Sequence, residues 1–159
     1  MKVVTVITVG TLKESYLREA VAEYEKRLSQ FAKVEHTELK EERIADESDP
    51  GQIRRALECE GEKILAAVPA GSYTVALCVE GKQMSSPALA EALDRGSDGS
   101  GKLCFIIGSS HGLAPAVKSA ANLRLSVSSL TFPHQLMRVM LAEILYRSFS
   151  ILAGKSYHK

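Results

Sequence analysis

Apolar residues along the chain are concentrated in short runs that are typical of strands. Three runs of β-branched and aliphatic residues predict buried strands, at 2–9, 72–81 and 102–108. Two weaker patterns, at 33–39 and 123–127, predict shorter strands, of which the first is expected at the outer edge of a sheet.

Between these strands, apolar positions recur every three to four residues, which predicts helices. The helices are expected at 13–31, 48–68, 85–95, 114–121 and 134–152. Asp49 is a suitable N-cap, with Pro50 at the first helical position. Ser86 is expected to cap the third helix, and Gly61 to interrupt the second. Strands that alternate with helices favour parallel pairing, so we expect an α/β fold with a parallel-rich sheet sandwiched by helices.

Length and composition indicate one domain. The chain has 159 residues, 45% of them apolar, and residues 1–159 are expected to share one core. No apolar run reaches 18 residues, so we expect no membrane span. The first ten residues are not followed by a small-residue cleavage site, which favours a cytoplasmic protein.

The three cysteines, Cys59, Cys78 and Cys104, show no metal-ligand spacing, and no metal site is expected. Cys78 and Cys104 lie in apolar runs, which favours small buried hydrophobic residues in a reducing compartment. A catalytic thiol is the alternative, but it has no basic neighbour in the sequence to activate it.

Charge is distributed unevenly along the chain. From residue 101 onward, seven Lys or Arg accompany a single acid, a net charge of +6, whereas the first hundred residues carry 13 basic and 18 acidic residues, a net charge of −5. This asymmetry favours an anionic partner for the C-terminal part. A solvated surface with chance clustering would give the same counts.

Two segments that follow predicted strands suit a ligand. "IIGSSHGL" places Gly108 and Gly112 around two serines and a histidine, so that backbone N–H groups can approach a ligand, although turn formation also explains it. "SVSSLTFP" at 126–133 combines hydroxyls with apolar surface, as an adenosine requires, although helix capping also accounts for it. Both loops are expected at the carboxyl edge of the parallel sheet.

The last predicted helix is more apolar than a surface helix requires. Its apolar positions form two adjacent columns, which consist of Leu136, Met137, Met140, Leu141, Ile144, Leu145, Phe149 and Leu152. The helix is expected to be central to the core or to pack on a second copy through Met137, Met140, Leu141 and Leu145. Arg138, Glu143 and Arg147 interrupt this surface. They are candidates for lining a site or for the surface ion pairs Glu143–Arg147 and Arg138–Glu143.

Four segments together resemble the ribosomal RNA large-subunit methyltransferase H family of the SPOUT superfamily. They are "LCVEGK" (77–82), "FIIGSSHGL" (105–113), "LTFPHQLMRVMLAEILYR" (130–147) and the terminal "SYHK". The resemblance covers the whole chain. It implies a trefoil knot in the C-terminal part and a homodimer whose cofactor-binding knots pack together. It also implies transfer of a methyl group from S-adenosyl-L-methionine (SAM) to N3 of a pseudouridine in 23S ribosomal RNA.

The resemblance also implies where the cofactor binds. The cofactor contacts would fall on Leu77, Gly108, Val127, Ser128, Ser129, Leu130, Thr131 and Phe132. Ser109 departs from the family, which usually has glycine there, and serine would be strained if this position required a positive φ.

Four residues are candidates for the chemistry on the RNA. His158 titrates near neutral pH and is a candidate for orienting or deprotonating the target base, and Tyr157 for stacking on it. Arg147 is a candidate for binding phosphate or a developing anionic carbonyl, and Glu143 is the alternative base. The tail 155–159 is expected to fold over the cofactor of its own or of a partner subunit.

The chain has no spare RNA-binding domain, so the expected substrate is the assembled large subunit or 70S ribosome. Two other functions stay open at this point. One is a non-catalytic RNA-binding module on the ribosome that uses the basic C-terminal half. The other is a nucleotide-binding regulator with a flavodoxin-like sheet.

Overall fold

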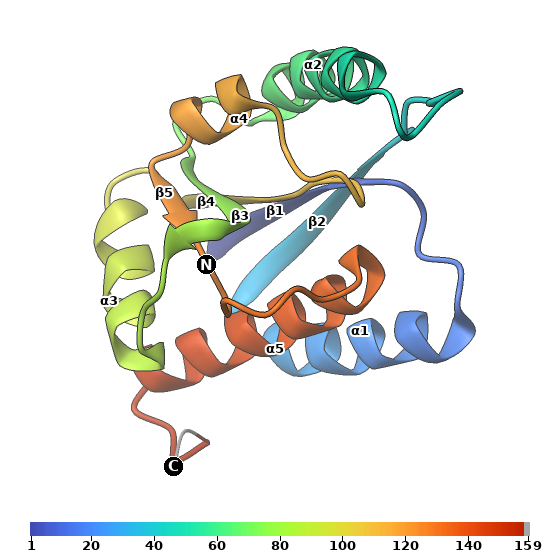
Figure 1. The fold of residues 1–159 in the computed structure, drawn as a ribbon. Coiled ribbons are helices and arrows are strands. Elements are labelled where there is room, and N and C mark those ends of the chain that lie inside the picture. The colour runs from blue at the N-terminus through green and yellow to red at the C-terminus, as the bar shows by residue number, and fades with distance from the viewer. Residues whose placement is uncertain (158–159) are drawn as a thin grey trace.

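The structure is a computed structural model that describes residues 1–157, in which strands and helices alternate strictly (Figure 1). The strands are β1 (Lys2–Val9), β2 (Ala32–Leu39), β3 (Tyr73–Lys82), β4 (Lys102–Ile107) and β5 (Leu123–Leu125). The helices are α1 (Ser15–Leu28), α2 (Pro50–Ala67), α3 (Ser86–Gly96), α4 (Pro115–Ala120) and α5 (His134–Leu152). Every predicted element is present, with boundaries shifted by at most about three residues.

The strands form one sheet in the order β2-β1-β4-β3-β5, and all neighbours are parallel. The predicted parallel sheet is confirmed, and β2 is indeed an edge strand. The flavodoxin-like alternative is wrong, because in that arrangement the third strand lies beside the first, whereas here β4 occupies that place.

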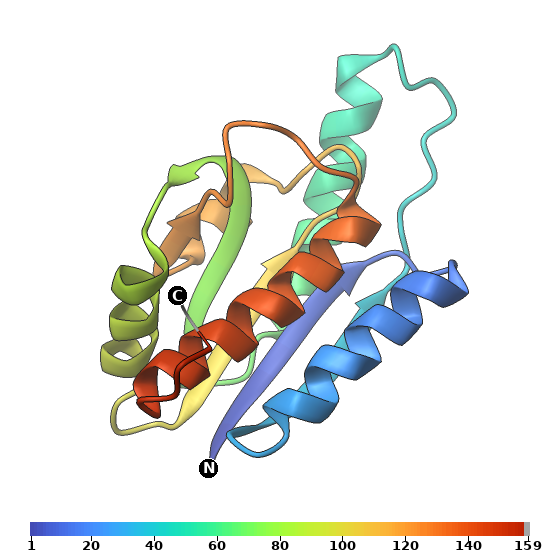
Figure 2. The same cartoon turned by 90° about the horizontal axis from the view of Figure 1, so that it is seen from below.

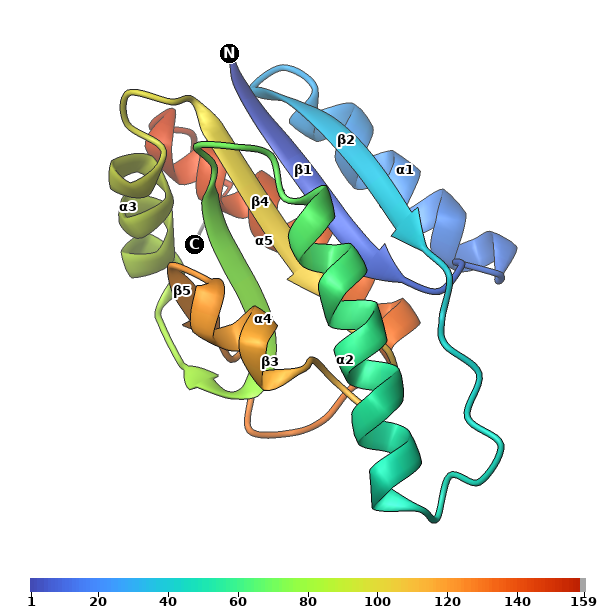
Figure 3. The ribbon, with the colours of Figure 1, turned by 90° about the horizontal axis from the view of Figure 1, so that it is seen from above.

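Helices cover both faces of the sheet and divide the core into two layers. Figure 2 shows α1, α3 and α5 on one face, and Figure 3 shows α2 and α4 on the other. Successive side chains of each strand point to opposite faces of the sheet and so pack in the two layers in turn. Val4 and Val6 of β1 pack with Leu145 of α5, whereas Ile7 packs with Ile64 of α2.

Two local predictions about helices are corrected. Ser85, not Ser86, is the N-cap of α3. Its hydroxyl accepts from the Ala88 amide at 3.2 Å, and its carbonyl accepts from the Leu89 amide, which closes the first turn. Gly61 does not interrupt α2. A Cβ there would lie 3.1 Å from the Cβ of Ala114, so the glycine permits close packing of α2 against the start of α4.

The structure confirms that α5 packs in the core and corrects two of the residues expected at an interface. Leu141 and Leu145 are each 1% exposed and pack in the core of their own chain, so they are not available to an interface. Met137 and Met140 are half-buried, and Leu136 is 37% exposed. Leu136, Met140 and the 41% exposed Leu152 therefore remain as outward apolar residues of the helix, whereas Met137 also packs against the core.

Of the two ion pairs considered on α5, one is present. Glu143 and Arg147 pair at 2.5 Å, as their spacing of four predicts. Arg138 does not pair with Glu143 but with Glu38 of β2, at 3.1 Å, because a spacing of five places residues 138 and 143 on different faces of the helix.

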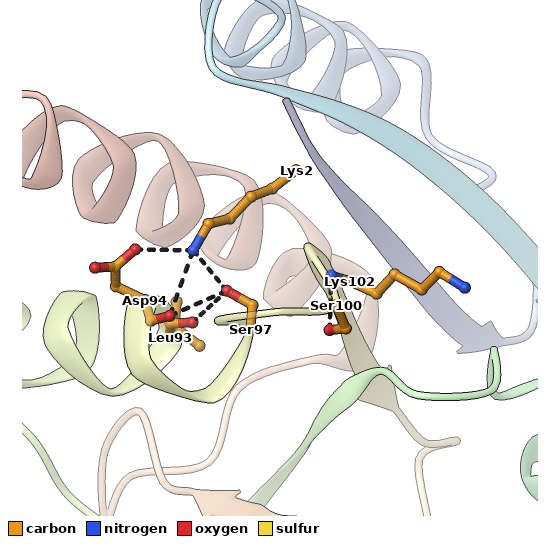
Figure 4. Close-up of polar contacts among 6 residues, drawn as sticks. All are labelled: Lys2, Leu93, Asp94, Ser97, Ser100 and Lys102. Atoms are coloured by element: carbon orange, nitrogen blue, oxygen red, sulfur yellow. Dashed lines mark hydrogen bonds and ion pairs between the residues drawn. The ribbon is translucent and has the colours of Figure 1, made fainter.

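At the amino-terminal edge of the sheet, Lys2 connects β1 to the last turn of α3 (Figure 4). Its Nζ donates to Oδ1 of Asp94 at 2.8 Å and to the hydroxyl of Ser97 at 2.6 Å, and that hydroxyl donates to the Leu93 carbonyl. A cation is favourable at the carboxyl end of a helix. These contacts fix this edge of the sheet, opposite the edge that carries the ligand loops.

Candidate functional site

A cavity of about 280 Å³ lies at the carboxyl edge of the sheet. Its walls are the end of β3, the loop after β4, the loop after β5 and the first turn of α5. Six of the eight predicted cofactor contacts line it: Leu77, Gly108, Val127, Leu130, Thr131 and Phe132. Segments about 50 residues apart in the sequence therefore meet at one cavity, as the parallel topology requires.

Ser128 and Ser129 belong to the same loop but not to the wall of the cavity. Ser128 instead organises the loop, since its hydroxyl accepts from the Leu130 amide at 3.0 Å and its carbonyl accepts from the Ser126 hydroxyl at 2.9 Å. Direct contact of these two serines with a cofactor stays a prediction.

The loop after β4 is a tight turn that requires glycine at two positions. A Cβ on Gly108 would lie 2.3 Å from the carbonyl oxygen of Gly112, and Gly112 itself has φ +90°. The Gly112 amide donates to the Ser109 carbonyl at 2.9 Å and closes the turn. Glycine is needed here because the backbone folds onto itself beside the cavity.

The strain considered for Ser109 is absent. No non-glycine residue in the part of the chain that the structure describes has a positive φ, so the serine adopts an ordinary backbone conformation. Its side chain is buried, and its hydroxyl accepts from the His111 amide at 3.4 Å. The departure from glycine therefore costs no backbone strain.

The end of β3 curls over β5 and forms another wall of the cavity. Leu125 pairs in register with both Leu77 and Lys82, and the residues of β3 between them bulge outward. A Cβ on Gly81 would lie 2.8 Å from the backbone of Arg124, so only glycine allows this approach.

Several residues at the rim of the cavity were not predicted. His111 and His134 line it, and His111 Nε2 lies 3.3 Å from Glu47 of the acidic loop 40–49. Lys118 of α4 pairs with Glu80 at 2.5 Å, and this contact holds the pKa of the Glu80 carboxyl below its usual value. Both histidines lie inside segments that were singled out in the sequence, "SSHGL" and "TFPH", and this proximity was the available signal.

A second cavity, of about 190 Å³, holds two of the predicted catalytic residues, Glu143 and Arg147. Its opposite wall is the start of α3, with Ser85 and Ser86. Leu125 and Val127 line both cavities, so the second cavity adjoins the first.

Glu143, Arg147 and Tyr157 form one cluster. The Arg147 guanidinium donates to Oε1 of Glu143 through Nε at 3.0 Å and Nη2 at 2.5 Å, and the Tyr157 hydroxyl donates to the same oxygen at 3.2 Å. The guanidinium carbon lies 4.9 Å from the centre of the Tyr157 ring. Three of the four predicted catalytic residues are thus brought together, and His158 lies outside the described residues.

The electrostatics of this cluster limit the roles of its members. Burial and the Glu143 carboxylate raise the pKa of the Tyr157 phenol, so it stays protonated at neutral pH. The hydrogen bond to Glu143 raises the pKa of Arg147 further. Glu143 therefore holds two donors, and Tyr157 is a donor and not a base.

Residues 155–157 of the tail lie along their own helices and not over their own cavity. Tyr157 packs edge-on against Tyr146, with ring centres 4.7 Å apart. Lys155 lies over the ring of Phe31, 4.8 Å from its centre. Neither Tyr157 nor Lys155 lines the 280 Å³ cavity.

The thiols are poor candidates for catalysis. Cys104 is fully buried, as predicted, and this burial raises the pKa of its thiol to about 12. Burial raises the pKa of the half-buried Cys78, and a hydrogen bond to Glu42 raises that of the exposed Cys59. Within residues 1–157, no group of three or more His, Cys, Asp or Glu could hold a metal ion, and no helix is long and apolar enough to cross a bilayer.

Known proteins similar in sequence to this chain indicate a methyltransferase, which agrees with the ligand cavity described above. The family model described as predicted SPOUT methyltransferase matches residues 1–158. The chain belongs to the SPOUT methyltransferase family. Relatives named ribosomal RNA large subunit methyltransferase H include those of Caldicellulosiruptor saccharolyticus, 47% identical over 98% of this chain and 99% of the relative, and Bacillus pumilus, 43% identical over the same shares. The relative from Streptococcus thermophilus is 46% identical over 98% of this chain and 99% of its own length.

Membership in this family confirms the resemblance found in the sequence. The chain is a methyltransferase, and this reading is supported over a non-catalytic RNA-binding module. A SPOUT methyltransferase needs a site for a methyl donor, and the 280 Å³ cavity is where the glycine turn and the loop 126–133 meet.

Proposed function

We propose that this SPOUT methyltransferase binds SAM in the 280 Å³ cavity and methylates N3 of a pseudouridine in 23S ribosomal RNA. The observation that carries the proposal is the convergence of six predicted cofactor contacts on that cavity, from β3 and from the two loops that follow β4 and β5. The relatives are named for methylation of large-subunit ribosomal RNA, which supports the substrate.

The lining of the cavity fits SAM. Leu77, Leu130 and Phe132 offer apolar surface for an adenine ring, and the turn that begins at Gly108 offers backbone groups without side-chain obstruction. The volume of about 280 Å³ lies just below the range for small-molecule sites, roughly 300–1,000 Å³. When bound, SAM would supply an electrophilic methyl group on its sulfonium, and the neutral thioether that remains would be the leaving group.

The second cavity is suited to the target nucleotide because it shares a wall with the first. Arg147 there can hold a phosphate or a carbonyl oxygen that becomes anionic as the N3 proton leaves. Glu143 orients Arg147 by accepting two of its N–H groups. Because Glu143 and Tyr157 are already engaged with each other, His158 is the better candidate for accepting the proton.

A homodimer would complete the site. The outward apolar residues of α5 and the 70% exposed Leu130 at the cavity provide a surface for a second copy. Residues 155–157 do not lie over their own 280 Å³ cavity, and Tyr157 contacts Glu143 and Arg147 of the second cavity. We propose that the tail, together with this second cavity, serves the cofactor cavity of the partner. The trefoil knot that the resemblance implies remains a prediction, as does action in the cytoplasm on the assembled large subunit or 70S ribosome.

Calorimetry with SAM and transfer of a labelled methyl group test this function. The purified protein should bind SAM and label 70S ribosomes that lack the modification, with the label at N3 of a pseudouridine. Free 23S RNA should be labelled more slowly, because the ribosome supplies contacts that this small chain lacks. Absence of both SAM binding and labelling would refute the proposed function, and equal rates on both substrates would refute the preference for ribosomes.

A further inference from the structure

A buried carboxylate behind the cavity has no role in the function described so far. Glu60 of α2 is 3% exposed, on the helix face that packs toward α4. No Lys or Arg pairs with it among residues 1–157, whereas Glu58 and Glu62 on the same helix are exposed. An unpaired carboxylate is costly to bury unless hydrogen bonds satisfy it.

Two segments outside α2 satisfy the Glu60 carboxylate. The backbone amide of Glu42, in the acidic loop 40–49, donates to Oε2 at 2.9 Å. The Ser109 side chain, in the glycine turn, lies near the same carboxylate and favours its charged form. Burial raises the pKa of Glu60, and the Glu42 amide and the Ser109 side chain oppose that shift.

Ser109 connects this carboxylate to the cofactor cavity. It lines the cavity, directly follows Gly108 and closes the turn with Gly112. Its hydroxyl has one proton to donate and lone pairs to accept with, so it can accept from the His111 amide and donate to Glu60 at the same time. The His111 amide therefore contacts Ser109, the Glu42 amide contacts Glu60, and the Ser109 hydroxyl lies beside the Glu60 carboxylate, where it can donate to it.

We propose that Glu60 is a positioning residue, which through the Ser109 hydroxyl fixes the turn 108–112 for the methyl donor and couples this turn to the loop 40–49. This inference rests on the proposed binding of SAM in the cavity. It assigns a purpose to the Ser109 side chain, since a glycine here would have no hydroxyl to offer a buried carboxylate.

Three variants separate the roles of the hydrogen bonds. Glu60→Ala removes both acceptors, and Ser109→Ala removes the link to the turn. Glu60→Gln retains both contacts, because the amide oxygen can accept from Glu42 and the amide nitrogen can donate to the Ser109 hydroxyl. Glu62→Ala, on the exposed face of α2, is the matched control.

The first measurement needs no cofactor. Hydrogen exchange of the free protein should become faster in both segments, 40–49 and 108–112, in Glu60→Ala, and only in 108–112 in Ser109→Ala. Glu60→Gln and Glu62→Ala should leave both segments protected as in the wild type. Unchanged exchange in Glu60→Ala, or faster exchange spread evenly over the whole chain, would refute the coupling.

The second measurement is a double-mutant cycle on SAM affinity by calorimetry. Each alanine variant should weaken SAM about fivefold to tenfold, the factor expected for one buried hydrogen bond, and the double variant should weaken it no further. Glu60→Gln should restore the affinity. Additive losses, or no loss in Ser109→Ala, would overturn the positioning role while the wild type still binds SAM. Failure of the wild type to bind SAM would instead overturn the proposed function and the cofactor part of this inference together.

Discussion

The contact between Gly108 and Gly112 predicts the effect of a single methyl group on cofactor binding. In Gly108→Ala the new Cβ would lie 2.3 Å from the Gly112 oxygen and 2.9 Å from Cδ2 of Leu113, whereas real Cβ contacts are essentially never shorter than 3.0 Å. The turn must therefore open by about 0.7 Å or more, and strain of this kind costs about 1–3 kcal/mol. A displacement near 1 Å in a binding site can reduce function about 10²-fold.

We expect Gly108→Ala to remain folded and to weaken SAM binding by one to two orders of magnitude, as measured by calorimetry. Gly99→Ala is the control for stability. Gly99 has φ +85° and no atom within 4 Å of its Cβ position, so alanine is strained there without disturbing the cavity. Its melting temperature should fall while SAM affinity is retained. Wild-type SAM affinity in a folded Gly108→Ala protein would refute the assignment of the cavity.

Three further predictions concern the buried carboxylate, the outward surface of α5 and the tail. Burial raises the pKa of Glu60, so its stabilising contribution is complete below the unfolded pKa and is lost as pH rises through the folded pKa. Glu60→Gln should thus gain melting temperature relative to the wild type as pH rises above the ordinary glutamate pKa of about 4.3, and a difference that stays constant with pH would contradict this. Met140→Glu should yield monomers in sedimentation, because the dimer would bury an unpaired charge, and a dimer of wild-type strength would contradict the interface. Truncation after Gly154 should lower turnover by about 10²–10⁴-fold, far more than it weakens SAM binding. A wild-type rate would direct the search for the base to Glu143 and Arg147.

The elements could be predicted from the sequence because each has a local signal. The apolar run at 2–9 and the Asp49-Pro50 start of α2 act over a few residues, and both are confirmed. The choice between Ser85 and Ser86 as N-cap could not be predicted, because both are serines and only the hydrogen bond that closes the first turn distinguishes them. The role of Gly61 required knowledge of a residue 53 positions away, Ala114.

The cavity could be predicted only in part, for the same reason. Gly108 and the loop 126–133 follow predicted strands, so the topology alone brings them to one edge. Glu60 gave no signal, because it is one of three acids at alternate positions of α2 and only the tertiary structure buries it. Likewise, sequence periodicity could not decide which apolar face of α5 packs on the sheet, and Leu141 and Leu145 were misplaced.

The central place of β1 has a consequence for synthesis of the chain. One side of β1 pairs with β2, which is complete at Leu39, but the other side pairs with β4, which ends at Ile107. At about 5–20 residues per second, translation leaves that side of β1 without its partner for roughly 3–14 seconds. The nascent chain therefore carries an open, β-branched strand edge, and chaperone binding or aggregation of truncated chains should be greatest for those that end before residue 107.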